Sequence, residues 1–231
     1  MIRLIAMFEA VPYESERRAM IEKQLRRRGI RDPRVLDTMF QIPRHEFVAP
    51  GLASRAYEDR PLPIGESETI SQPYIVAVMT EAVRVQPGEK VLEVGAGSGY
   101  QAAILAHLGA TVYAVERNTD LAEAARRRLA RLGYTGIEIL CGDGTEGYAA
   151  AAPYQVIVVT AASPPQIPQP LLDQLSSGGR LVIPVGERER QELQLIFRHG
   201  DEFATRLLDP CQFIPLIGKY GWPEVQPTIG I

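Results

Sequence analysis

The chain has 231 residues, of which 25 are Lys or Arg and 28 are Asp or Glu, so its formal net charge is −3. This length suits a single domain with an ample core, and a slightly acidic chain lacks the positive field that holds nucleic acid. No run approaches the ~18 apolar residues that a membrane span needs, and the first residues do not match a targeting signal, so we expect a cytoplasmic protein. The two cysteines lie far apart without metal-ligand spacing, so we also expect no bound metal.

Two helices are expected at the start of the chain. Residues 15–28 predict the first helix, with Ser15 as its N-cap and Gly29 as the left-handed residue that ends it. Asp32-Pro33 begins the second helix, because Asp is a good N-cap and Pro fits the first helical position. This helix ends before Pro43.

A long proline-rich segment follows. Residues 43–73 keep apolar and aromatic side chains, which favours an ordered, functional loop over a disordered one. Apolar residues then repeat at helical spacing from Pro73 to Val85. Ser71 stands just before this helix, and its side chain is an expected N-cap, a role that does not prevent its hydroxyl from also contacting a ligand.

The middle of the chain alternates strands and helices. No proline lies between Pro87 and Pro153, and ten of the 20 glycines fall in that window. Helices are expected up to Leu108 and over 121–132, and apolar strands at 90–94, 111–116, 137–141, 155–160 and 180–185. Apolar strands separated by helices predict an α/β fold, a mostly parallel sheet covered on both faces. Residues 191–197 and 203–208 look like strands without helices between them, which predicts an antiparallel edge.

We therefore predict one domain over residues 1–231. Residues 1–87 supply an N-terminal helical extension and a loop that covers the site. Residues 88–190 form a Rossmann-like cofactor core, and residues 191–231 add C-terminal strands.

The strongest local signal is a glycine loop after the strand at 90–94. Gly95, Gly97 and Gly99 let backbone N–H groups approach a ligand, although they could also serve only a tight turn. The spacing is G-x-G-x-G, and Tyr100 stands where a dinucleotide fingerprint has its third glycine. A nicotinamide oxidoreductase is therefore disfavoured, and no Gly-Lys-Ser/Thr follows that would make a P-loop.

Acidic residues end the next two strands. Glu116 stands where an acid can accept hydrogen bonds from ribose hydroxyls, and Asp143 lies in Gly142-Asp143-Gly144 at the same edge of the sheet. Glu116 could instead be a capping or surface acid, and Asp143 could make an Asx turn. Together with Glu93 they suit a ligand with a ribose, an amine-bearing base and a positive charge, which S-adenosylmethionine provides and NAD does not.

The chain resembles the protein-L-isoaspartate (D-aspartate) O-methyltransferases from about Glu16 to Trp222. The cofactor portion, VLEVGAGSGYQAAILA, is shared loosely with class I methyltransferases. More specific segments are PRHEFV at 43–48, AYEDRPLPIG at 56–65, TISQPYIVAVMTE at 69–81, GDGTEGY at 142–148, residues 159–186 and FIPLIGKYGW at 213–222. The resemblance implies a class I, Rossmann-like fold and methyl transfer from S-adenosylmethionine to the α-carboxylate of L-isoaspartyl and D-aspartyl residues, the first step in repairing damaged proteins.

The resemblance also implies a set of site residues. Ser71 would be the active-site residue, bordering both ligands together with Thr69 and Ile70. The full cofactor set is Thr69, Ile70, Ser71, Glu93, Gly95, Ala96, Gly97, Gly99, Tyr100, Glu116, Arg117, Asp143, Gly144 and Thr160. The substrate set is Ser71, Ile64, Thr160 and Ala161, where small residues after a strand leave room for a peptide.

Two positions depart from the family pattern. Glu68 replaces a usual Gln and puts a negative charge near a site for an anionic substrate, which could weaken binding or change peptide preference. Gln155 replaces a usual Asp at the start of a strand, where the Asp can be structural. These departures keep two alternatives open, a methyltransferase with another acceptor and a catalytically weak, cofactor-binding homologue.

Methylation of a carboxylate places few demands on the protein. A carboxyl pKa near ~4 leaves all but about 0.1% ionised at pH 7, so no general base is needed. Positioning is the main contribution, and His45, His107 and His199 need no catalytic role. The expected partners are isoaspartyl proteins and peptides, with the enzyme acting as a monomer and binding neither nucleic acid nor membrane.

Overall fold

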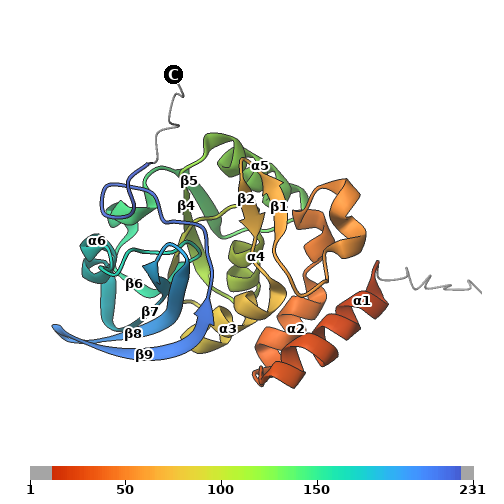
Figure 1. Ribbon diagram of the computed structural model, residues 1–231, viewed down its shortest axis with the longest axis horizontal. Coiled ribbons are helices and arrows are strands. Elements are labelled where there is room, and N and C mark those ends of the chain that lie inside the picture. The colour runs from red at the N-terminus through yellow and green to blue at the C-terminus, as the bar shows by residue number, and fades with distance from the viewer. Residues whose placement is uncertain (1–11, 225–231) are drawn as a thin grey trace, which may run out of the picture.

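A central seven-stranded sheet organises the computed structural model, which describes residues 12–224 (Figure 1). The expectation about a targeting signal, and both ends of the predicted 1–231 domain, lie outside the described residues. The strand order is β5-β4-β3-β6-β7-β8-β9. The strands are β3 Lys90–Val94, β4 Thr111–Glu116, β5 Ile137–Cys141, β6 Tyr154–Val159, β7 Leu175–Glu187, β8 Arg190–His199 and β9 Glu202–Cys211.

The predicted mixture of parallel and antiparallel pairing is confirmed. Strands β3 to β7 pair in parallel, and β8 and β9 add antiparallel strands at one edge. The chain moves outward from β3 through β4 to β5, and then returns to the other side of β3 with β6. This reversal of strand order at β3 makes its carboxyl end a place where ligands bind in such sheets.

Both faces of the central strands are buried, which explains why β6 is apolar at successive positions. On β6, Val156 and Val158 face the core formed with the N-terminal helices, α3 and α4. The neighbouring Ile157 and Val159 face a second core that includes Leu171 of α6. Successive side chains point to opposite faces, so a strand covered on both sides needs apolar residues at every position.

Helices and turns supply the covering layers (Figure 1). They are α1 Glu14–Ala19, continued by a π-helical turn Met20–Leu25 and a 3-10 turn Arg26–Arg28, α2 Pro33–Gln41, α3 Pro73–Val83, α4 Tyr100–His107, α5 Thr119–Arg131 and α6 Gln169–Asp173. Gly29 ends the first helical run in a left-handed conformation, and Asp32 caps α2, both as predicted. Ser15 as N-cap is wrong, because Tyr13 takes that position and Ser15 donates instead to the Glu16 carboxylate at 2.7 Å.

The predicted cap of α3 is also wrong. Gln72, not Ser71, is the N-cap residue, and its own side chain makes no capping hydrogen bond. The Tyr74 N–H in the first turn instead donates to Asp59 Oδ1 at 3.3 Å. An acid from a preceding loop therefore does the capping, which leaves the Ser71 hydroxyl outside this role.

The proline-rich segment is more regular than its sequence suggests. It forms 3-10 turns at Arg44–Phe47 and Pro50–Arg55, and then a hairpin of β1 Leu62–Gly65 and β2 Glu68–Ile70. Glu66 and Ser67 make the turn with φ of 52° and 60°. Hairpin turns with positive φ usually carry Asn or Gly, so this one gives no sequence signal.

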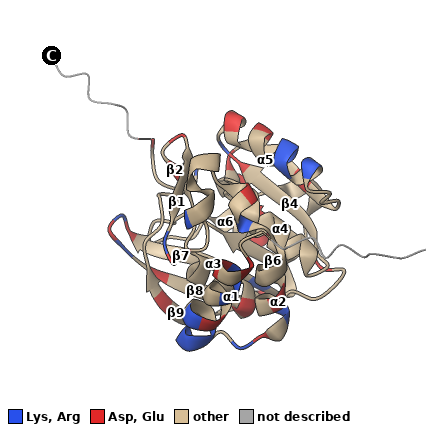
Figure 2. Cartoon of the chain, turned by 90° about the vertical axis from the view of Figure 1, so that its right-hand side faces the viewer, with Lys and Arg blue, Asp and Glu red and all other residues tan. Residues whose placement is uncertain are grey.

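Lys and Arg positions and Asp and Glu positions are interspersed along the helices and strands (Figure 2). On α5 the acidic Asp120 lies in the first turn and Arg128 and Arg131 lie in the last, an order that complements the helix dipole. Within residues 12–224, no helix is long and apolar enough to cross a bilayer.

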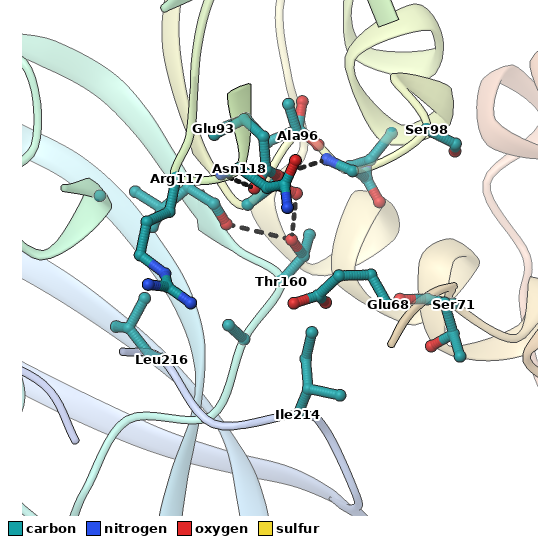
Figure 3. A pocket seen from close by; sticks show the side chains of 18 of the residues that line it. Glu68, Ser71, Glu93, Ala96, Ser98, Arg117, Asn118, Thr160, Ile214 and Leu216 are labelled. Carbon is teal, nitrogen blue, oxygen red and sulfur yellow. Dashed lines mark hydrogen bonds between the residues drawn. The ribbon is translucent and has the colours of Figure 1, made fainter. Parts of the chain in front are cut away.

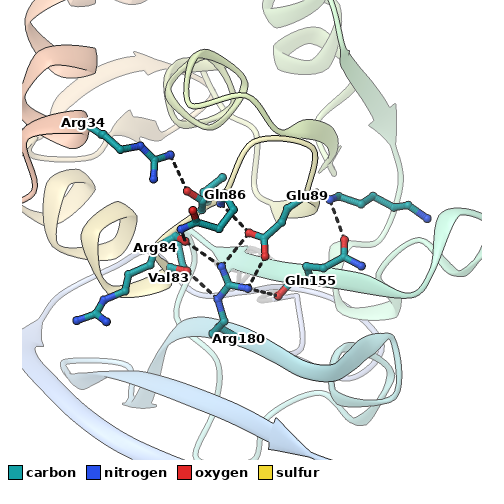
Figure 4. A network of polar contacts seen from close by, with 9 residues as sticks. Arg34, Val83, Arg84, Gln86, Glu89, Gln155 and Arg180 are labelled. Atoms are coloured by element: carbon teal, nitrogen blue, oxygen red, sulfur yellow. Dashed lines mark hydrogen bonds and ion pairs between the residues drawn. The ribbon is translucent and has the colours of Figure 1, made fainter.

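One ion pair joins three parts of the fold (Figure 4). Arg180 on β7 contacts both carboxylate oxygens of Glu89, at 2.7 and 2.8 Å, and its Nε donates to the Val83 carbonyl at the end of α3 at 2.8 Å. Burial raises the pKa of Glu89, but Arg180 and the Gln86 N–H, which donates to Glu89 Oε2 at 2.9 Å, together hold that pKa below its usual value. Next to this pair, Gln155 Oε1 of β6 accepts a hydrogen bond from the Lys90 N–H of β3. Gln155, which departs from the family pattern, therefore links two neighbouring strands of the sheet.

We expect Arg180→Met to destabilise the protein by about 2–4 kcal/mol, because it leaves Glu89 without its partner in a partly buried place. Urea unfolding followed by circular dichroism measures this change. The matched control is Arg127→Met, which breaks an exposed i,i+4 ion pair with Glu123. Such a pair contributes only about 0.3–0.5 kcal/mol to stability. Equal losses for the two variants would contradict a structural role for the Arg180 pair.

Candidate functional site

A pocket lies at the carboxyl ends of β3, β4 and β6, where the strand order reverses (Figure 3). It contains about 1020 Å³ of empty space, part of it open solvent. The loop after β3 and the ends of β4 and β6 form its floor, and the β1–β2 hairpin, parts of α3 and α4 and a C-terminal segment around residues 214–217 surround it. The expected edge of the sheet therefore carries the site.

The glycine loop is tightly held against β4 and β6. The Gly95 N–H donates to the Val115 carbonyl at 2.8 Å, and Thr160 Oγ1 lies 2.6 Å from the Gly95 carbonyl oxygen. Gly95 has φ +92°, and a Cβ there would come within 2.6 Å of Thr160 Oγ1. Glycine is therefore required at 95 both by backbone conformation and by space.

Glu116 supports the same loop. Its Oε2 accepts from the Gly97 N–H at 2.8 Å, and its Oε1 accepts from the Asn118 N–H at 2.9 Å. The side chain lines the pocket and is almost buried. Each carboxylate oxygen has further lone pairs, so Glu116 can hold the loop and still accept hydrogen bonds from a ligand.

Glu93 is the most unusual group in the pocket wall. Its side chain is fully buried, and neither carboxylate oxygen has a hydrogen-bond partner among the described residues. Burial, and then the nearby charge of Glu116, raise the pKa of Glu93 well above its usual value. A buried polar group without a partner is costly, so a donor or a cation in the pocket would relieve it.

The hairpin contributes another acid. Glu68 points from β2 into the pocket (Figure 3), and burial followed by the charge of Glu116 raises its pKa. Arg117 opposes this shift, but its guanidinium is largely exposed and pairs with Glu224 at 2.8 Å. The pocket therefore favours a ligand that carries positive charge.

The predicted TIS segment forms the wall that faces the glycine loop. Thr69, Ile70 and Ser71 all line the pocket. The Ser71 backbone carbonyl accepts a hydrogen bond, but its hydroxyl has no partner within residues 12–224. That hydroxyl is therefore available to a ligand.

The C-terminal segment folds back beside the end of β6. The Ala162 N–H donates to the Ile214 carbonyl at 2.7 Å, and the Leu216 N–H donates to the Ala162 carbonyl at 2.8 Å. Ile214 and Leu216 consequently line the pocket next to the end of β6 (Figure 3).

Three predicted site residues do not line the pocket. Asp143 accepts hydrogen bonds from the Thr145 N–H at 2.8 Å and from the Lys219 N–H at 2.7 Å, and so anchors the C-terminal segment. Its neighbour Gly144 does line the pocket. Gly99 begins α4 where a Cβ would lie 3.1 Å from Leu129 of α5. Ile64 covers the loop from outside, 3.3 Å from a Cβ placed on Gly97.

The remaining predicted residues line the pocket, together with several that sequence reasoning missed. Tyr100 reaches the pocket with a buried ring that packs on Phe47. The additional residues include Ser98, Gln101, Asn118, the apolar Val76, Met79, Val94 and Val115, and Ile214 to Ile217. Asn118 had a usable signal, since it caps α5 two residues after Glu116. Residues 214–217 lie in the family segment FIPLIGKYGW at 213–222, and their pairing with Ala162 places them in the pocket wall.

Comparisons of sequence agree on one family. The model of protein-L-isoaspartate(D-aspartate) O-methyltransferases (PCMT) matches residues 15–221. A Methanoculleus marisnigri protein named protein-L-isoaspartate O-methyltransferase is 58% identical over 220 residues, covering 95% of this chain and all of that protein. One from Syntrophotalea carbinolica with the same name is 53% identical over 213 residues, covering 92% and 98% of the two chains.

Solved structures agree with this result. A protein-L-isoaspartate O-methyltransferase structure superposes with a TM-score of 0.79 at 30% identity, over 89% of this chain and 67% of the other. A Plasmodium falciparum protein described as a protein-L-isoaspartate O-methyltransferase, in complex with S-adenosyl-L-homocysteine, gives a TM-score of 0.75 at 25% identity. It covers 89% of this chain and 98% of its own.

The buried acid gives a pH-dependent prediction for the ligand-free protein. The pKa of Glu93 is raised in the folded state, so stability is complete below the unfolded-state pKa near ~4.3 and is lost as pH rises through the folded value. We expect Glu93→Gln to raise the Tm, and the gain to grow between pH 5 and pH 8. Differential scanning calorimetry measures it, with about 2–4 °C for each kcal/mol in a domain of this size.

Glu116→Gln is the matched control for this prediction. Its carboxylate accepts two backbone N–H groups, so an amide there should lower the Tm at both pH values. If the difference in Tm between Glu93→Gln and the unaltered protein does not change with pH, the result would contradict a raised pKa of Glu93.

Proposed function

Because this chain belongs to the protein-L-isoaspartate(D-aspartate) O-methyltransferase family, we propose that Ser71 orients the substrate carboxylate in its active site. The enzyme transfers a methyl group from S-adenosylmethionine to L-isoaspartyl residues. We place its action on damaged proteins in the cytoplasm, as a monomer that needs neither nucleic acid nor membrane.

The uncommitted Ser71 hydroxyl is the observation that carries this proposal. It lies on the pocket wall that faces the glycine loop, and the capping of α3 by Asp59 leaves it free. A hydroxyl that donates to one carboxylate oxygen fixes the orientation of the other oxygen, which attacks. The start of α3 also favours an anion near Ser71.

The residues of the pocket fit the methyl donor. Gly95 leaves no room for a side chain, the Glu93 carboxyl lacks a partner, and Glu116 can accept from ribose hydroxyls. The acidic wall suits a ligand with a sulfonium and an ammonium group. S-adenosylmethionine, when bound, supplies an electrophilic methyl group, and its product, S-adenosylhomocysteine, carries one positive charge less.

The protein has little proton chemistry to perform. The acceptor carboxylate is ionised at neutral pH, so no side chain has to remove a proton. The chain instead contributes position, which lowers a barrier by up to roughly 7–11 kcal/mol when the attack geometry is held. The rigid contacts of Thr160 and Glu116 with the glycine loop serve that purpose.

We expect Ser71→Ala to lower kcat/KM for an isoaspartyl peptide about 10–100-fold, the loss for a hydrogen bond to a charged group. The assay follows labelled methyl transfer to an isoaspartyl peptide and to its aspartyl twin. Ser67→Ala is the control, because Ser67 lies in the exposed hairpin turn outside the pocket lining. Unchanged turnover in Ser71→Ala would refute the role of this residue, and equal methylation of the twin would point to another acceptor.

Glu68 gives a separate prediction about charge. Glu68→Gln removes one negative charge from the pocket, so we expect a lower KM for the anionic isoaspartyl peptide. We also expect a smaller difference in affinity between cationic S-adenosylmethionine and its product, S-adenosylhomocysteine. Each change should be about 3–10-fold, on the order of 1 kcal/mol for a charge near a protein surface. Steady-state kinetics with product inhibition measures both.

Glu66→Gln is the control for Glu68. Glu66 also borders the pocket, but it lies in the exposed hairpin turn, so its effect should stay below twofold. Identical behaviour of the two variants would exclude a specific electrostatic role for Glu68.

A further inference from the structure

Arg44 is a buried cation that has no part in the methyl transfer proposed for the pocket. It begins the 3-10 turn Arg44–Phe47, and none of its side chain is exposed. Its two hydrogen bonds go to backbone carbonyls rather than to a carboxylate, and its Nη1 is buried without a partner among the described residues. Burial of an unpaired charge is expensive, so stability alone does not explain an arginine here.

The two carbonyls bound by Arg44 are far apart in the sequence. Its Nε donates to Ala56 O and its Nη2 donates to Ser71 O, both at 2.7 Å. Residues 56–71 contain the whole β1–β2 hairpin, including Thr69 and Ile70 of the pocket wall. One planar guanidinium therefore fixes both ends of the segment that carries the acceptor side of the site.

The same guanidinium also contacts the cofactor side. Its central carbon lies 4.7 Å from the ring centroid of Tyr100, the first residue of α4 after the glycine loop. The Phe47 ring also packs against Tyr100 in an edge-to-face arrangement, with 5.3 Å between centroids. Arg44 thus lies between the Ser71 segment and the start of α4.

We propose that Arg44 is a positioning residue, which holds Ser71 at a fixed place relative to the glycine loop through the Ser71 carbonyl. This inference rests on the proposed role of Ser71. Displacement of a reacting group by about 1 Å can cost 10²-fold in rate, so loss of the clamp should appear mainly in kcat. Binding of the cofactor, which depends on Glu116 and the glycine loop, should change little.

Arg44→Lys keeps the charge but cannot reach both carbonyls with a planar fork. We expect it to lower kcat for an isoaspartyl peptide about 10–100-fold, with the Kd for S-adenosylhomocysteine, measured by calorimetry, within about threefold. Arg44→Gln is the second variant. It avoids burial of a bare ammonium, remains folded more easily, and should show the same loss in kcat.

Arg17→Lys is a matched control. Arg17 is also buried, and its guanidinium donates to two backbone carbonyls, Phe40 O at 3.0 Å and Gln41 O at 3.1 Å, at the end of α2 and away from the pocket. Each variant is compared at a temperature well below its own Tm. A clamp predicts a large loss in kcat for the Arg44 variants alone.

A double-mutant cycle with Ser71→Ala separates positioning from general structural damage. If Arg44 acts through Ser71, Arg44→Lys should cost less than about threefold in the Ser71→Ala background, because coupled residues are not additive. Additive losses, or losses that follow the Tm equally for Arg17 and Arg44, would overturn the inference. Failure of the proposed function itself looks different, since the unaltered enzyme would then form no methyl ester on the isoaspartyl peptide.

Discussion

The reversal of strand order at β3 is the constraint on which the site depends. It leaves the carboxyl end of β3 between β4 and β6, and the glycine loop fills that position. Val115 of β4 and Thr160 of β6 hold the loop from its two sides. The position of the glycine loop in the pocket is therefore set by the sheet, which suits a reaction that depends on alignment.

Charge divides the pocket into two parts. Glu68, Glu93 and Glu116 form an acidic wall, and burial raises the pKa of Glu68 and Glu93. The acceptor side, in contrast, has the start of α3 and the buried Arg44 behind Ser71. Under the proposed function, a cationic donor would lie against the acidic wall and an anionic acceptor near Ser71, and this difference in charge would favour one relative orientation of the two reactants.

Local patterns predicted most elements for physical reasons that are visible in the structure. The strands are apolar at successive positions because both faces are covered, and Gly29 and Asp32 end and begin helices by their own backbone and side-chain preferences. The expectations for Ser15 and Ser71 as N-caps failed because a left-handed Tyr13 and a distant Asp59 took over at those helix starts. When a residue from a distant loop caps a helix, the sequence at the start of that helix contains no capping residue that would reveal it.

The sequence by itself determined the family, through motifs spread over most of the chain, and it predicted the edge of the sheet at which the pocket lies. Such motifs are local features, because each lies within one continuous stretch of residues. Only the tertiary structure decided that Asp143 anchors residues 213–222, that the Glu93 carboxyl has no hydrogen-bond partner within residues 12–224, and that Arg44 joins the two sides of the pocket. Each of these depends on contacts between segments that are distant along the chain. Such contacts follow from how the layers pack, and no local pattern of residues specifies them.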